Sequence, residues 1–214
     1  MSSATNSESS RIQGSDLTLL HYKPFSSHEH YQQVMRAHRK LQESGFYWGA
    51  IGGREANYLL RSENPGTFLV RDSSDHRHFF TLSVRTTRGT KNLRIHSEVG
   101  GFYLEPDPQN TEELPQFDCV LKLITHYMGK SDTGRSRDGA SGGRTVEKER
   151  KVYLIHSGEE KIPLELQKPL MSSLSSLQHM CRRTLNEAGL GELERTEQLP
   201  QTLKDFMQKY DAPI

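Results

Sequence analysis

One arginine directly after a short apolar run is the residue of this chain best suited to bind an anion. Phe68, Leu69 and Val70 precede Arg71, whose permanent charge must find a partner if the run forms a strand of a covered sheet. In a strand, Leu69 and Arg71 share one face, so the guanidinium is expected at the floor of a pocket on that face. The alternative is a strand end whose arginine pairs with a surface carboxylate.

The residues that follow have the chemistry of an anion-binding loop. Asp72, Ser73 and Ser74 bring hydroxyl and backbone N–H groups to a turn. A second guanidinium, Arg94, lies on a strand expected over 91–96, where its alternative role is that of a solvated strand residue. Two guanidiniums suit a phosphate dianion better than a singly charged carboxylate. We therefore predict a phosphate site formed by Arg71, Ser73, Ser74 and Arg94.

A sheet with helices against it must hold these groups in place. Alternating apolar residues predict neighbouring strands over 80–85, 91–96 and 102–104. Helical patterns are predicted over 54–60 and 117–128, the second with an apolar stripe that faces a core. A helix on each side of an antiparallel sheet gives an α+β fold.

The N-terminal part of the chain divides into three segments. Residues 1–16 are polar and serine-rich and are expected to be disordered. Residues 17–25 hold five large apolar side chains in a stretch that Pro24 keeps from being helical, so this arm needs a surface, either on its own domain or on a partner. Ser26 and Glu29 then form a capping box for an amphipathic helix that ends at Gly45.

The C-terminal part contains two more helical patterns. Residues 129–150 include five glycines and almost no large apolar residue, which indicates a flexible insertion. Apolar alternation resumes at 152–155 and 162–166. Two helices follow after Pro169, the second opened by Pro200. The first has an apolar face for which no sheet remains, so it is either half of a self-contained hairpin or a surface for a partner. This face is formed by Leu174, Leu177, Cys181, Thr184 and Leu185.

Composition limits the possible functions. The 28 basic and 27 acidic side chains give a net charge of +1, which argues against a general nucleic-acid binder. No apolar run approaches the ~20 residues of a membrane span, and no apolar signal segment is present, so we expect a cytoplasmic protein. Cys119 and Cys181 lie in apolar helical patterns and are predicted to be buried. His28, His30 and His38 lack the companions of a metal site, and we expect neither metal nor cofactor.

The chain shows no set of catalytic residues. It has no glycine loop, catalytic lysine and Asp-Phe-Gly set of a kinase, and neither cysteine lies in the arginine-closed phosphate loop of a tyrosine phosphatase. Paired catalytic carboxylates are likewise missing. We therefore expect a binding protein and not an enzyme.

The motif Phe-Leu-Val-Arg followed by Asp-Ser-Ser, preceded by Trp48 and a short helix, resembles the phosphotyrosine-binding signature of Src-homology-2 (SH2) domains. Together with the flanking segments, the likeness covers nearly the whole chain, which is identified as a member of the suppressor of cytokine signalling family. The resemblance implies an SH2 domain at 46–168 with the insertion at 129–150. An extended helix at 28–45 precedes this domain, and an all-helical SOCS box at 169–214 follows it.

The same resemblance implies the partners. Phosphotyrosine on cytokine receptors would occupy the site at Arg71, and a kinase inhibitory region at 17–27 would block Janus kinases as a pseudosubstrate, with Pro24 as a departure from the family form. The residues implied in this inhibition are Tyr22, Lys23, Phe25 and Ser26. Leu177, Cys181 and Leu185 match the elongin-binding spacing of the SOCS box. Leu199 and Pro200 match the first half of the cullin-selecting box, in which Thr202 stands in place of a proline.

Taken together, these features imply a negative regulator of signalling through Janus kinases and STATs. It would bind phosphotyrosine, inhibit the kinase directly and recruit an elongin and cullin ubiquitin ligase. The alternative is a ubiquitin-ligase substrate receptor for phosphotyrosine proteins that does not inhibit the kinase directly.

Overall fold

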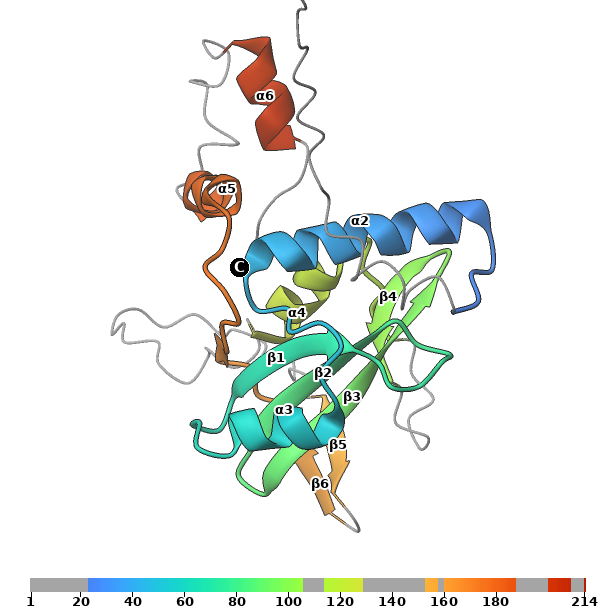
Figure 1. Cartoon of the computed structure of the whole chain (residues 1–214), viewed down its shortest axis with the longest axis vertical. Coiled ribbons are helices and arrows are strands. Elements are labelled where there is room, and N and C mark those ends of the chain that lie inside the picture. The colour runs from blue at the N-terminus through green and yellow to red at the C-terminus, as the bar shows by residue number, and fades with distance from the viewer. Residues whose placement is uncertain (1–22, 106–113, 129–152, 158–159, 188–199, 209–213) are drawn as a thin grey trace, which may run out of the picture.

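The computed structural model describes residues 23–105, 114–128, 153–157, 160–187, 200–208 and 214. Its centre is a five-stranded sheet in the order β4-β3-β2-β1-β7, with antiparallel pairing except for β7, which is parallel to β1 (Figure 1). The strands are β1 (Thr67–Asp72), β2 (Phe80–Thr86), β3 (Gly89–Glu98), β4 (Gly101–Leu104) and β7 (Lys168–Pro169). The expected disordered segment 1–16 and insertion 129–150 lie outside the described residues.

Helices cover both faces of this sheet. Helix α3 (Gly53–Leu60) lies on one face, while α2 (His28–Ser44) and α4 (Val120–Met128) lie on the other (Figure 1). The α+β fold with an antiparallel central sheet is therefore confirmed. The edge strand predicted at 102–104 is β4. Before α3, Tyr47 makes an isolated parallel bridge to Val70 of β1.

The period-2 pattern of β1 divides the core into two clusters. Leu69 packs with Ala56 and Leu60 of α3. Phe68 and Val70 point the other way into a larger cluster with residues of α2 and α4. A strand buried on both faces must be apolar along its length, and the charged Arg71 is the exception on the α3 face.

Helix α2 begins at His28, the first residue of the expected helix, but its N-cap lies one residue later than the capping box predicted. Its N-cap is Ser27, whose Oγ accepts a hydrogen bond from the His30 N–H at 3.0 Å, so the capping box expected at Ser26 is wrong. The N–H and Oγ of Ser26 instead lie within hydrogen-bond distance of Nδ1 of His30, at 3.2 and 3.0 Å. Gly45 ends the helix with a left-handed φ of +85°, as the stop signal indicated.

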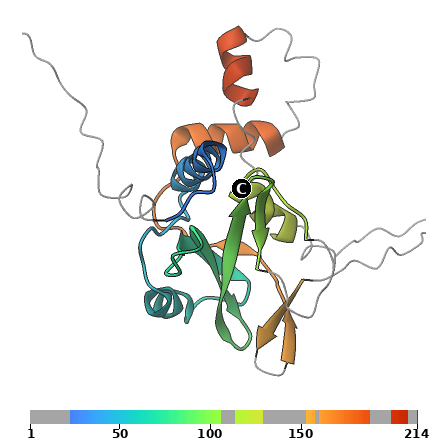
Figure 2. The ribbon, with the colours of Figure 1, turned by 90° about the vertical axis from the view of Figure 1, so that its right-hand side faces the viewer.

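The C-terminal segments add a hairpin and two helices. Strands β5 (Leu154–Ser157) and β6 (Glu160–Pro163) form a separate two-stranded sheet, from which Ile155 reaches the large cluster. Helix α5 (Leu177–Glu187) lies beside α2, and α6 (Gln201–Gln208) lies further from the sheet (Figures 1 and 2). Helix α5 starts at Leu177, so Leu174, the first residue of the predicted apolar face, lies outside the helix.

Candidate functional site

Arg71 is buried at the end of β1, with only 4% of its surface exposed. Its Nε donates to Ser83 Oγ at 3.1 Å, Nη1 to the Asp72 carbonyl at 2.9 Å and Nη2 to Asn92 Oδ1 at 3.2 Å. All three acceptors are neutral groups. Burial lowers the pKa of Arg71, and the nearby charge of Asp72 partly opposes this shift.

The first residue of α3 lies close to this guanidinium. A Cβ at Gly53 would lie 3.4 Å from Nη2 of Arg71, which is van der Waals contact. The guanidinium therefore lies between α3 and the sheet, as predicted from the alternation along β1.

Strand register aligns the two predicted arginines. Arg71 pairs with Thr81 on β2, and Thr81 pairs with Arg94 on β3, so the three side chains form one row on the α3 face of the sheet. Arg94 is not free to approach an anion in this structure. Its Nε lies 3.3 Å from Asp75 Oδ2, and its Nη1 lies 2.7 Å from Glu105 Oε1.

The loop from Ser73 to Phe79 connects β1 to β2 beside this row. Its ends are joined by a hydrogen bond from the Ser73 N–H to the Phe79 carbonyl at 3.0 Å. Ser73 is buried, and its Oγ accepts from the Asp75 N–H at 3.2 Å, whereas Ser74 is exposed. The hydrogen bonds from Arg77 hold the pKa of Asp75 well below its ordinary value. The loop is thus ordered by its own side chains.

Two further histidines extend the site away from Arg71. His78 of the loop and His96 of β3 make an edge-to-face contact with ring centroids 4.5 Å apart, and His96 stacks on Tyr103 at 5.0 Å. Burial lowers the pKa of both histidines. Neutral rings are therefore favoured beside the Arg94 guanidinium.

Sequence reasoning missed the residues that orient the arginine. Ser83 Oγ donates to Asn92 Oδ1 at 2.7 Å, and both oxygens accept from Arg71. The signal was available in the alternation pattern, because the predicted strand pair placed both side chains on the face of Arg71. What the pattern lacked was the register, which brings Ser83 directly opposite Asn92.

The predicted arm begins beside this loop. Tyr22 lies outside the described residues. Lys23 donates to loop carbonyls, and Ser26 is exposed next to α2. The half-buried ring of Phe25 stacks on Phe79 with centroids 4.8 Å apart. The sequence left two possible surfaces for the arm, its own domain or a partner. In this structure the described part of the arm lies on its own domain.

Helix α5 presents the predicted elongin-binding residues outward. Leu177 is 73% exposed, Cys181 is exposed, and Leu185 is half-buried. The expected burial of Cys181 is therefore wrong, whereas that of Cys119 is confirmed. The opposite side of α5 is buried at His179 and Arg182, and Nη1 of Arg182 lies 3.7 Å from Oε2 of Glu43 on α2.

Of the cullin-selecting box, only part is described. Leu199 lies outside the described residues, and Pro200 is exposed at the start of α6, where its carbonyl accepts from the Lys204 N–H at 3.2 Å. Thr202 is also exposed.

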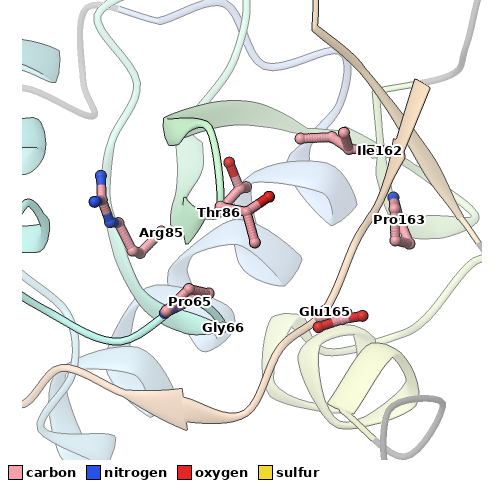
Figure 3. Close-up of a pocket in the computed structure, with 8 residues that line it drawn as sticks. Pro65, Gly66, Arg85, Thr86, Ile162, Pro163 and Glu165 are labelled. Atoms are coloured by element: carbon pink, nitrogen blue, oxygen red, sulfur yellow. The ribbon is translucent and has the colours of Figure 1, made fainter. Parts of the chain in front are cut away.

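A shallow cleft lies at the start of β1, at the other end of this strand from Arg71 (Figure 3). Its volume of about 80 Å³ is well below the ~300 Å³ of small-molecule sites. The cleft is lined by Pro65, Gly66, Arg85, Thr86, Thr87, Ile162, Pro163 and Glu165. We assign it no ligand.

No group of three or more His, Cys, Asp or Glu side chains in the described part of the chain is arranged to hold a metal ion. None of the helices in those residues has the length and apolar character needed to cross a membrane.

The chain is similar to one protein-family model and to several known proteins. The family model described as SH2 domain matches residues 46–127. Suppressor of cytokine signaling 3 of Gallus gallus is 53% identical over 197 residues, which cover 92% of each chain. The Homo sapiens protein of the same name is 50% identical over 209 residues, again 92% of each chain. Suppressor of cytokine signaling 2 of Homo sapiens is 35% identical and covers 85% of this chain and 83% of that protein.

Proposed function

Because the chain belongs to the suppressor of cytokine signalling family, we propose that it is an adaptor that restrains cytokine signalling by binding phosphotyrosine through its SH2 domain. The tyrosine-phosphorylated partners are cytokine receptors that signal through Janus kinases and STATs. The adaptor catalyses nothing itself and acts in the cytoplasm, where these receptor tails are presented.

The burial of Arg71 among neutral acceptors is the observation that carries the phosphotyrosine proposal. Among the described residues, its hydrogen bonds go only to Ser83, Asp72 and Asn92, each through a neutral oxygen. A buried cation without a paired anion is unfavourable, because desolvation removes the water that would otherwise stabilise it. A phosphate dianion supplies the missing negative charge and matches the planar fork of the guanidinium.

Ser73, Ser74 and Arg94 complete the proposed phosphate site. Arg94 lies in the same row as Arg71 and exchanges its ion pair with Asp75 for the phosphate. This exchange costs little, because the Arg94 side chain is 42% exposed and its ion pairs are partly screened by water. Ser74 contributes from the exposed side of the loop.

Replacing Arg71 by lysine tests this function. The variant Arg71→Lys keeps the charge but loses the bidentate fork, so affinity for phosphotyrosine peptides should fall at least about tenfold. Calorimetry with a phosphotyrosine peptide and its unphosphorylated form measures the change. Arg39→Lys, the same substitution at an exposed position of α2, is the matched control and should bind as the wild type does. Equal affinities of Arg71→Lys and wild type would remove the phosphate site.

We also propose that residues 17–27 inhibit Janus kinases as a pseudosubstrate, with Tyr22, Lys23, Phe25 and Ser26 in the kinase groove. Ser27, the last residue of this segment, caps α2, so the helix fixes the direction in which the arm leaves the domain. For inhibition, Phe25 must exchange its contact with Phe79 for the kinase surface. That contact favours the alternative, a ligase receptor whose arm is inert.

The proposed ligase partner binds helix α5. Leu177 and Cys181 lie one turn apart on the exposed side of this helix, where they insert into a groove of elongin C. Leu185 extends the same contact. Leu199 and Pro200 then direct the elongin pair to a cullin scaffold. Bound receptor or kinase is thereby presented for ubiquitin transfer.

A further inference from the structure

Lys23 makes an unusual set of contacts for a residue of an N-terminal arm. Its Nζ donates to the carbonyl oxygens of Ser73 at 2.8 Å, His78 at 2.5 Å and Asp75 at 3.5 Å. An ammonium group has three donors, and here all of them point at the backbone of one loop. Burial lowers the pKa of Lys23, while the nearby charges of Asp72 and Asp75 oppose this shift.

These contacts determine the direction of other groups in the loop. In a trans peptide unit, the carbonyl of one residue and the N–H of the next point in opposite directions, and the described chain contains no cis peptide bond. Because the carbonyls of Ser73 and Asp75 face Lys23, the N–H groups of Ser74 and His76 face the other side of the loop. Backbone N–H groups turned outward from a tight turn are anion-binding groups.

We infer that Lys23 is a positioning residue for the phosphate-binding loop. By holding the carbonyl side of residues 73–78, it sets the amide groups of Ser74 and His76 for the phosphate without touching the ligand. Phe25 strengthens this attachment by stacking on Phe79, where the loop ends. The inference rests on the proposed phosphotyrosine function. It gives Lys23 a role besides the kinase inhibition that the family resemblance implies.

The energetic reason is pre-organisation. Without the ammonium, the carbonyls of Ser73 and His78 lose this partner, while that of Asp75 keeps the hydrogen bond from the His78 N–H. The loop then samples more conformations. Phosphate binding must then order the loop, and this cost is subtracted from the affinity. A loop that Lys23 already holds does not incur this cost when the ligand binds.

A titration of the full chain with phenyl phosphate, followed by the amide signals in NMR, tests the inference. Lys23→Met removes the ammonium at nearly constant length and should weaken binding about fivefold, the effect of losing hydrogen bonds of modest net strength. The amide signals of Ser74 and His76 should shift before any ligand is added and should respond less to phenyl phosphate. Signals of α4 and the centre of the sheet should remain unchanged, which separates positioning from global unfolding.

Two further variants make the result decisive. Lys168→Met removes an exposed lysine from β7 and should leave binding and the loop signals unchanged, so an equal loss in both variants would overturn the inference. Arg71→Lys is titrated in parallel. If it loses binding while Lys23→Met binds as the wild type does, only the positioning role fails; if Arg71→Lys itself binds normally, the proposed function fails. Should Lys23→Met not fold, Lys23→Gln is titrated against the same control.

Discussion

At the scale of single residues, the guanidinium of Arg71 is oriented before any ligand binds. Ser83 and Asn92 hydrogen-bond each other and together accept from two of its nitrogens. A cation fixed in this way loses little conformational freedom when it meets a phosphate, so less of the interaction energy is lost to ordering. The buried position of Arg71 also weakens the competition from water.

Phe25 offers a residue-scale test of the arm. Its ring contacts Phe79 and also lies edge-on to Tyr31, with centroids 5.0 Å apart. We expect Phe25→Ala to lose roughly 1–2 kcal/mol of stability, because a half-buried ring and its aromatic contacts are removed. If the arm is a pseudosubstrate, the same variant should inhibit a purified Janus kinase domain at least about tenfold less strongly than the wild type.

The kinase assay contains neither receptor peptide nor ligase components, so that only the arm acts. Tyr58→Ala removes an exposed ring from α3 and serves as the control, which should inhibit normally. Inhibition by Phe25→Ala equal to that of the wild type would instead support the ligase receptor with an inert arm.

At the scale of elements, the end of α2 joins the SH2 domain to the segment before α5. The carbonyl of Gly45 accepts from the N–H groups of Ser172 and Ser173, at 2.8 and 3.2 Å. Nη1 of Arg182, on α5, lies 3.7 Å from Oε2 of Glu43, near the end of α2. The C-terminal helix therefore starts from a fixed point on the domain.

Gly45 is the position where this junction is most sensitive. Its φ of +85° disfavours any other residue, and a Cβ there would lie 2.8 Å from the Ser173 carbonyl. We expect Gly45→Ala to lose roughly 1–3 kcal/mol in urea unfolding. Gly49 has a φ of +60°, and an added Cβ there would have nothing within 4 Å. Gly49→Ala should therefore lose only the stability that comes from the unfavourable backbone conformation, with no loss from a steric contact. Equal losses would show that the contact with residues 171–175 contributes nothing to stability.

The exposed side of α5 provides a second element-scale prediction. Because Leu177 is 73% exposed, Leu177→Asp should change the free energy of unfolding by no more than about 0.5 kcal/mol. If α5 is the elongin-binding helix, the same variant should abolish co-purification with elongin B and C, because a charge would be buried in the partner's groove. Val99→Asp replaces another exposed aliphatic residue and should retain the pair. If Leu177→Asp still bound elongin, the binding surface would lie elsewhere.

At the scale of the whole molecule, buried and half-buried histidines couple folding to pH. Burial lowers the pKa of His30, His78, His96 and His179 below the ordinary value. Each folded-state pKa lies below the unfolded one, so the unfolded chain binds protons first as the pH falls through about 6.5. The stability from these groups is thus complete above this pH and is lost as the solution becomes more acidic.

We therefore expect lower stability in urea unfolding at about pH 5.5 than at about pH 7.5. His30 should carry part of this dependence, because its Nδ1 accepts from the Ser26 N–H, and this bond is lost on protonation. His30→Gln should reduce the dependence, whereas His28→Gln, at an exposed position of the same helix, should not. Constant or rising stability toward acid would contradict the assignment of neutral buried rings.

The sequence by itself determined the α+β class, the faces of β1 and the candidate phosphate residue, because each follows from local patterns. Period-2 alternation assigns Leu69 and Arg71 to one face, and a lone charge after an apolar run requires an anionic partner or a neutral set of acceptors. The helix stop at Gly45 was equally local, since only a few residues can adopt a positive φ.

Only the tertiary structure decided how distant segments meet. Strand register, which the alternation pattern does not specify, set Ser83 against Asn92 and aligned Arg71 with Arg94 through Thr81. The contacts of Lys23 with a loop at least 50 residues away follow from the path of the chain into α2, and no local pattern encodes that path. Burial of a side chain depends on what packs against it, which is why Cys181, in an apolar helical pattern, is exposed while Arg71 is buried.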